Sequence, residues 1–314
     1  MIGRLRRSLR RRLHKSGVPG GLSPESDFSL GVPFGYDPVL CETARVAAMV
    51  HMFHPDLAPE CAEFLRYLPR AAKVLITTDT EAKRSAILSA FSDWEADRIE
   101  VRLVPNRGRD MAPKLTAFVD RYTEFDLILF LHSKKTDHSP DAAGWRQLLF
   151  AGLCGSEHVV CSILALFAAD PALGLVFPQH HEPIRPYTGW EYNFATARRV
   201  ARRMGVELRR KGNLEFPSGS MFWARPAALE SLLALGLRVE DFPTESGQLE
   251  GTPAHAIERL FALSVELSGF GWIKVSAPAH YSRHDTIVTP RSPEELGAFL
   301  DRPRLRLRDT MTKG

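Results

Sequence analysis

Residues 126–135 read Asp-Leu-Ile-Leu-Phe-Leu-His-Ser-Lys-Lys, and this stretch decides the fold class. Its apolar centre is uninterrupted, which is typical of a parallel strand that is buried on both faces. Such a strand needs helices on either side of its sheet to cover it. The stretch ends in a polar turn, and in open α/β sheets ligands bind beyond the carboxyl ends of the strands.

The sequence on both sides of this strand alternates between short β-rich runs and helical stretches. Strands are predicted at 45–53, 73–78, 99–104, 126–132, 173–177, 220–224 and 273–277. Helices are predicted at 56–68, 81–91, 111–122, 143–154, 159–169, 190–203, 226–236 and 253–268, the last with Thr252 as N-cap. This order predicts an α/β fold in which a mostly parallel, Rossmann-type sheet is flanked by helices.

The charge of the chain is concentrated at its two ends. Its 314 residues include 41 Lys and Arg against 37 Asp and Glu, a formal net charge of +4. Residues 1–15 hold seven basic residues and no acid, and residues 302–314 hold five basic residues and one acid. The body between them is therefore net acidic, so a nucleic-acid partner is not expected.

The first fifteen residues also carry a helical apolar pattern. Ile2, Leu5, Leu9 and Leu13 share one helical face, and arginines cover the rest. A basic amphipathic helix of this kind is expected to lie on an anionic membrane surface, with a solvated, unstructured arm as the alternative. The predicted organisation is an arm and linker at 1–43, one α/β domain at 44–285 and a tail at 286–314.

Other features narrow the cellular context. No apolar run is long enough to span a bilayer, and no apolar stretch follows the basic start as it would in a secretory signal. Cys41, Cys61, Cys154 and Cys161 lack metal-ligand spacing and are expected to be buried thiols in a reducing cytosol. We therefore expect a cytoplasmic protein, held peripherally on the inner face of the cytoplasmic membrane.

Polar side chains follow several of the predicted strands. In chain order they are Thr78 and Asp79, then Asn106, Arg107, Gly108, Arg109 and Asp110, then His132, Lys134 and Lys135. Glycine beside two arginines permits close backbone approach to a phosphate or sugar, although Asn and Asp also cap ordinary turns. The lysines place cations where a diphosphate would lie, or they merely keep a loop soluble. Neither a dinucleotide-binding fingerprint nor a P-loop follows any strand.

The second half of the chain offers two further candidates. Trp223, in the run Gly-Ser-Met-Phe-Trp-Ala-Arg, is a candidate floor for a sugar ring, or part of a buried strand. On the helix predicted from residue 253, His255, Glu258 and Arg259 share one face. They follow a loop with Glu245 and Glu250, which suits a general base and its orienting partners; an intrahelical charge network is the alternative.

Four blocks at 106–110, 130–135, 219–225 and 251–261 resemble those of the rhamnan synthesis protein F family, over about residues 51–273. That family is associated with rhamnose-containing cell-surface polysaccharides. The order of the blocks is also similar to that of inverting GT-A glycosyltransferases, whose metal-binding Asp-x-Asp is replaced here by His132-Ser133-Lys134. Because the two carboxylates are missing, no metal cofactor is expected.

The resemblance implies a GT-A-like glycosyltransferase that moves rhamnose or a related deoxysugar from a nucleotide-sugar donor to a glycan or lipid-linked acceptor, with inversion. Glu245 would be the base, with Glu250 as second choice, and His255 and Arg259 would orient it or bind the acceptor. The donor would be held by Thr78, Asp79, the turn at 106–110, His132, Lys134 and Lys135, with Trp223 and Glu258 as further substrate contacts. The alternatives are a non-catalytic glycan-binding or scaffolding component of a membrane-associated polysaccharide assembly, and a nucleotide-binding enzyme outside glycosyl transfer.

Overall fold

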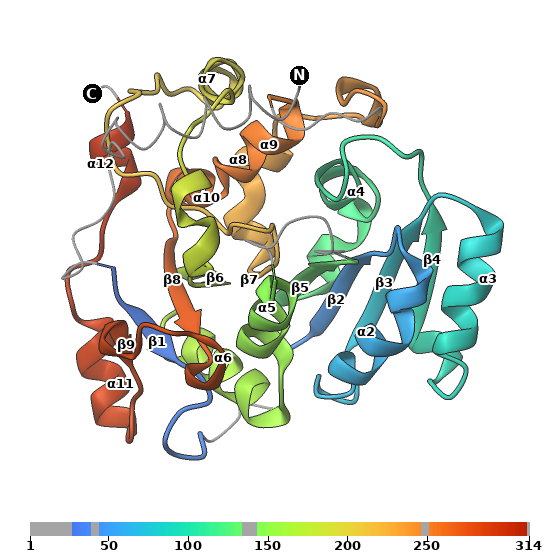
Figure 1. Cartoon of the computed structure of the whole chain (residues 1–314), viewed down its shortest axis with the longest axis horizontal. Coiled ribbons are helices and arrows are strands. Elements are labelled where there is room, and N and C mark those ends of the chain that lie inside the picture. Colours follow the sequence, from blue (N-terminus) through green and yellow to red (C-terminus); the bar gives the residue numbers. More distant parts are fainter. Residues whose placement is uncertain (1–26, 39–43, 134–142, 246–250, 313–314) are drawn as a thin grey trace, which may run out of the picture.

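The computed structural model describes residues 27–38, 44–133, 143–245 and 251–312. The described residues build one nine-stranded sheet in the order β4-β3-β2-β5-β7-β6-β8-β1-β9 (Figure 1). Its strands are β1 Ser29–Gly31, β2 Val46–His51, β3 Lys73–Thr78, β4 Ile99–Leu103, β5 Leu127–His132, β6 Leu173–Pro178, β7 Phe222–Ala224, β8 Gly271–Ser276 and β9 Ile287–Val288. Only β7 runs antiparallel to its neighbours among these strands, so the predicted mostly parallel sheet is confirmed.

Helices cover both faces of the sheet, as predicted. They are α2 Ala58–Leu65, α3 Glu81–Ala90, α4 Met111–Thr116, α5 Trp145–Cys154, α6 Glu157–Ala169, α7 Phe194–Arg203, α8 Glu230–Leu233, α9 Pro253–Glu258, α10 Phe261–Leu267, α11 Pro293–Leu300 and α12 Leu307–Met311. The strands supply alternate side chains to two cores, because successive residues of a strand point to opposite faces. In β5, Leu129 and Leu131 join one core, whereas Ile128 and Phe130 join the other.

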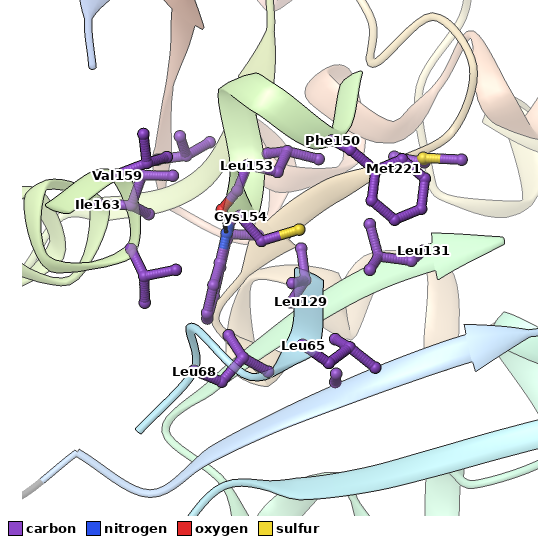
Figure 2. Close-up of a cluster of buried hydrophobic side chains, with 14 of the residues drawn as sticks. Leu65, Leu68, Leu129, Leu131, Phe150, Leu153, Cys154, Val159, Ile163 and Met221 are labelled. Atoms are coloured by element: carbon purple, nitrogen blue, oxygen red, sulfur yellow. Dashed lines mark hydrogen bonds between the residues drawn. The ribbon is translucent and has the colours of Figure 1, made fainter. Parts of the chain in front are cut away.

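Figure 2 shows part of the first core, in which α5 and α6 pack over β5. Leu153 and Ile163, from these two helices, lie with Leu129 in one apolar cluster. Cys61 and Cys154 are free thiols in the same core, and burial raises the pKa of Cys61 to about 12. Cys161 is half-buried, and Cys41 lies outside the described residues.

Several predicted helices differ from the structure. The helix predicted at 111–122 is α4 followed by a 3-10 helix at Val119–Glu124. The helix predicted at 253–268 is two helices, of which α9 ends at Glu258 and α10 begins at Phe261. The side chain of Thr252 does not cap a backbone N–H of α9; its Oγ1 lies 2.8 Å from Nδ1 of His255, with which it forms a hydrogen bond.

Segments that the sequence assigned to linker and tail also contribute to the folded body. β1 and β9 form one edge of the sheet. From α12, Leu307 and Met311 are almost wholly buried in the second core. The predicted boundaries at 43 and 285 stay a prediction, and the arm at 1–15 lies outside the described residues. Among the described residues, no single helix has the length and apolar composition of a membrane span, although α5 and α6 meet these two criteria as a pair bent by 63°.

Candidate functional site

A cavity of about 500 Å³ opens where β2 and β5 end. Its walls come from the turn before α4, the start of α5, the turn before β7, and α9. The two strands are parallel and in register, so His51 and His132 lie side by side at the carboxyl edge of the sheet. The cavity therefore lies where ligands bind in open α/β sheets.

His51 is held in the neutral form. Its ring Nδ1 lies 2.9 Å from Oγ1 of Thr77 on the neighbouring strand, within hydrogen-bond distance. Burial lowers the pKa of His51 to about 4, and the nearby charge of Asp110 offsets this only in part. The ring at this wall of the cavity is thus uncharged at neutral pH.

The turn at Gly219 and Ser220 connects two walls of the cavity. Both residues have left-handed backbone conformations, with φ of 85° and 52°. The Nε2–H of His132 donates to the Gly219 carbonyl at 2.8 Å, and the Gly219 N–H donates to Oε1 of Glu258 at 2.9 Å. The turn therefore ties the end of β5 to α9.

A buried ion pair lies beneath the same turn. Lys114 Nζ is 3.0 Å from Oδ2 of Asp110 and 2.6 Å from the Ser220 carbonyl oxygen, and the Ser220 hydroxyl donates to Asp110. Burial alone would raise the pKa of Asp110, but the charges of His132 and Lys114, with these hydrogen bonds, hold it well below its usual range. Asp110 is therefore an anion whose carboxylate is engaged by Lys114 and Ser220.

Burial lowers the pKa of Lys114, and the charge of Asp110 offsets part of this effect. Lys114 was not predicted as a site residue from the sequence. It follows Asp110 by four residues at the start of a predicted helix, and this spacing favours an ion pair. Because its ammonium group joins α4 to the turn before β7, we interpret Lys114 as a residue that positions the floor of the site.

Glu245 is brought to the cavity by the turn at 106–110. Residue 107 pairs with Thr244 in an isolated β-bridge, and the Arg107 guanidinium donates to the Phe242 carbonyl at 3.1 Å. Gly108 has a φ of 63°, and a Cβ there would come within 2.6 Å of the Phe242 ring. These contacts place Oε2 of Glu245 3.6 Å from Nε of Arg109.

Of the predicted site residues, the cavity brings together Asn106, Arg109, Asp110, His132, Glu245, His255 and Glu258. Arg107 and Gly108 shape the turn beside it. Lys134, Lys135 and Glu250 lie outside the described residues. Four other predicted positions do not line this cavity.

Trp223 is a correction. Its side chain is wholly buried in the first core, and its Nε1–H donates to the Leu153 carbonyl at 3.0 Å. Thr78 is likewise wholly buried, and its hydroxyl donates to the Met52 carbonyl at 2.9 Å. Both belong to strands of a sheet that is covered on its two faces, so their side chains are buried and do not reach the crevice.

Asp79 and Arg259 have structural contacts outside the cavity. Asp79 forms an ion pair at 2.7 Å with Lys83, one turn along α3. Arg259 is almost wholly buried, and its guanidinium donates to the carbonyls of Gly189 and His255, which ties α9 to the chain before α7. His255 lies in the cavity wall as predicted, and its ring forms a hydrogen bond with Thr252.

The cavity also includes residues that sequence reasoning missed. Phe53 and His54 directly follow β2, so the polar end of that strand was a usable signal. Trp145 gave none, because only the folded chain brings the start of α5 to this edge. Gly219 and Ser220 begin the block at 219–225 that carries part of the family resemblance, but no site role was predicted for them.

The described residues do not fit a carboxylate metal site. None of their His, Cys, Asp and Glu side chains form a group of three or more that could hold a metal ion. His132 stands where the GT-A glycosyltransferases that the sequence resembles have the first Asp of Asp-x-Asp, and its ring donates a hydrogen bond to the Gly219 carbonyl. Metal independence stays a prediction.

One family model matches most of the chain. The model of the family described as rhamnan synthesis protein F matches residues 35–267. Two relatives from Xanthomonas campestris pv. campestris, both described as uncharacterized protein WxcX, are 33% identical over 225 residues, which is 70% of this chain and 31% of each relative. The chain thus spans about a third of the length of the curated relatives that it matches.

Several solved structures are also similar to the chain. One of them is described as mannosyltransferase PcManGT from Pyrobaculum calidifontis in complex with GDP-Man and Mn²⁺. The two are 15% identical, the TM-score is 0.45, and the match covers 87% of this chain and 63% of the other.

Proposed function

The chain belongs to the rhamnan synthesis protein F family, and on that premise we propose that it is a glycosyltransferase of cell-surface polysaccharide synthesis. It would transfer rhamnose or a related deoxysugar from a nucleotide-sugar donor to a glycan or lipid-linked acceptor, with inversion. The cavity supports this proposal because it combines the strand-end position of an α/β ligand site with a carboxylate next to a cation.

The availability of Glu245 carries the proposal. Among the described residues, three acidic side chains line the cavity. Asp110 is buried and ion-paired, and Glu258 accepts a hydrogen bond from the Gly219 backbone. Glu245 retains 23% exposure, and its nearest Arg109 nitrogen, at 3.6 Å, lies beyond hydrogen-bond length. It is therefore the carboxylate best placed to accept a proton from an acceptor hydroxyl.

In the proposed reaction, Glu245 removes the proton of the acceptor hydroxyl, and the hydroxyl oxygen attacks the anomeric carbon of the donor sugar. A new glycosidic bond forms, the bond from the anomeric carbon to the diphosphate breaks, and the nucleoside diphosphate leaves with its electron pair. Arg109 would stabilise the charge of the leaving group, joined by Lys134 and Lys135, which follow β5 in the sequence. Asn106, in the same wall as Arg109, would contact the nucleoside.

The proposed donor chemistry needs no divalent metal, because basic side chains would replace its charge. Activity that EDTA abolishes and Mn²⁺ restores would overturn this part of the proposal. Residues 1–15 would form an arm that holds the enzyme at the cytoplasmic membrane surface, where a lipid-linked acceptor lies. Deleting them should weaken binding to anionic vesicles and leave donor affinity unchanged.

The function is tested by incubating the purified full chain with a panel of nucleotide sugars, with and without a lipid-linked glycan acceptor. We expect release of nucleoside diphosphate from one deoxysugar donor, strongly increased by the acceptor. Glycan binding without any release would instead support the non-catalytic component. Release that does not depend on the acceptor would support a different nucleotide-using enzyme.

A further inference from the structure

One surface of the protein is strongly basic although the body as a whole is acidic. Between positions 198 and 211, seven basic residues accompany a single acid, Glu207. We call this surface the basic face; its members are Arg198, Arg199, Arg202, Arg203, Arg209, Arg210 and Lys211. It takes no part in the proposed reaction, since none of these side chains lines the cavity described above.

The fold directs this charge outward. Helix α7 buries Ala197, Val200 and Ala201 against the second core, so its arginines lie on the opposite side. The segment after the helix is fixed by pairing with the C-terminal end of the described chain, where the N–H of residue 209 donates to the Met311 carbonyl at 2.6 Å. The basic face is therefore a fixed feature of the folded body.

The single acid on this surface is already neutralised. Glu207 accepts a hydrogen bond at 2.6 Å from Nε of Arg202 and another from Arg198. The hydrogen bond from Arg202, followed by that from Arg198 and the two positive charges, lowers the pKa of Glu207 to about 2. The remaining five basic side chains of the face are exposed to solvent.

Two exposed tyrosines lie on the chain that leads into α7. Tyr192 is 71% exposed and Tyr187 is 47% exposed, which is unusual for large aromatic side chains. Their segment is tied to the wall of the cavity, because Arg259 donates to the Gly189 carbonyl and the N–H of Gly251 donates to Asn193. Tyrosine is enriched at membrane–water interfaces, where its ring meets lipid and its hydroxyl meets water.

The basic face is joined to the cavity wall through helix α9. Helix α7 packs against α9, and His255 and Glu258 of α9 line the cavity. Figure 1 shows both helices at the top of the view. One helix–helix contact therefore connects the basic face to the wall of the cavity.

We propose that the basic face, together with Tyr187 and Tyr192, docks on the anionic lipid surface of a membrane. The positive charge is complementary to anionic headgroups, and the tyrosines add the interfacial contact that a soluble polyanion does not need. Because the rest of the body is acidic, the attraction is local and orients the cavity toward the headgroup plane. The docking does not depend on the proposed reaction, since it is measured without donor or acceptor.

The test compares vesicle binding by the full chain and two matched triple variants. One variant, Arg199→Glu/Arg210→Glu/Lys211→Glu, reverses three charges of the basic face. The other, Arg70→Glu/Arg291→Glu/Arg302→Glu, makes the same change in net charge at exposed positions elsewhere. Sedimentation with vesicles of phosphatidylcholine and phosphatidylglycerol gives the partition coefficient, and thermal melting confirms that both variants fold.

We expect the basic-face variant to lose about 100-fold or more in partition coefficient and the control variant to lose less than about tenfold. Tyr192→Ser should weaken binding to vesicles but not binding to soluble dextran sulfate. Equal losses in the two triple variants would overturn the proposal, because net charge alone would then explain the binding. A Tyr192→Ser variant that binds both ligands like the wild type would also overturn it and assign the face to a soluble polyanion.

Discussion

Lys114 Nζ lies 3.0 Å from Oδ2 of Asp110, and both side chains are almost wholly buried beneath the cavity. The ammonium group also contacts the Ser220 carbonyl, and it lies 5.0 Å from the centre of the Phe222 ring. The Lys114 cation thus balances a buried carboxylate and fixes the turn at Gly219 and Ser220. Gly219 in turn contacts His132 and Glu258.

Lys114→Met should lower the free energy of unfolding by about 3–5 kcal/mol, because it leaves the carboxylate of Asp110 buried without its ion-pair partner. The double variant Asp110→Asn/Lys114→Met should recover part of this loss, since no charge is then left uncompensated. Urea denaturation measures both.

Lys83→Met is the matched control, because Lys83 pairs with Asp79 at the same spacing of four residues but both side chains retain some exposure. This variant should lose at most about 1 kcal/mol. If Lys114→Met were no more destabilising than Lys83→Met, the buried pair would not have the structural role described here.

The stability of the protein should depend on pH through His51. Its pKa falls from the ordinary 6.5 to about 4 on folding, mainly because of burial. Between these values the unfolded chain binds the proton and the folded chain does not, so the free energy of unfolding decreases as the pH falls from 6.5 toward 4. The contribution of this one residue is at most about 3 kcal/mol.

Urea titrations at a series of pH values measure this dependence, and His51→Asn should give a shallower slope than the wild type in that window. The exposed His284→Asn variant should keep the wild-type slope. A slope that is the same in His51→Asn and the wild type would show that His51 is not held neutral by the fold.

Gly219→Ala should both destabilise the protein and reduce turnover. The residue has a φ of 85°, and a Cβ would come within 2.9 Å of Leu149 and 3.1 Å of Trp145. Gly205→Ala is the control, because Gly205 has a φ of 84° but no heavy atom within 4 Å of the added Cβ.

Both variants introduce backbone strain of about 1–2 kcal/mol, and Gly219→Ala should lose at least about 1 kcal/mol more through the close contacts. Only Gly219→Ala should lower turnover, since its backbone holds Glu258 and His132. Equal turnover in the two variants would contradict the role of this turn.

The sequence was sufficient to predict the central strands and the order of the helices. Uninterrupted apolar runs such as 127–131 are long enough to identify buried strands without tertiary information. β1 and β9 have only three and two residues, so they show no periodicity, and their pairing depends on β8 and on each other. The break between α9 and α10 was missed because buried residues continue on both sides of it.

For the site, sequence reasoning found the strand ends but could not assign the direction of individual side chains. Asn106, His132 and Glu245 meet because their segments reach the same edge of the sheet. Thr78 ends β3 and Trp223 lies in β7, and both side chains are wholly buried, because helices cover both faces of the sheet. The contact between Lys114 and Ser220 joins residues 106 positions apart, and no local pattern predicts it.

The central claim, that Glu245 is the base of a glycosyl transfer, is tested most directly by measuring turnover and donor affinity in Glu245→Gln. The control is Glu240→Gln, a nearby exposed glutamate. We predict that turnover in Glu245→Gln falls by about 10²- to 10⁴-fold while the donor dissociation constant stays within about threefold, and that Glu240→Gln behaves as the wild type. Unchanged turnover, or equal losses in turnover and donor affinity, would contradict the account.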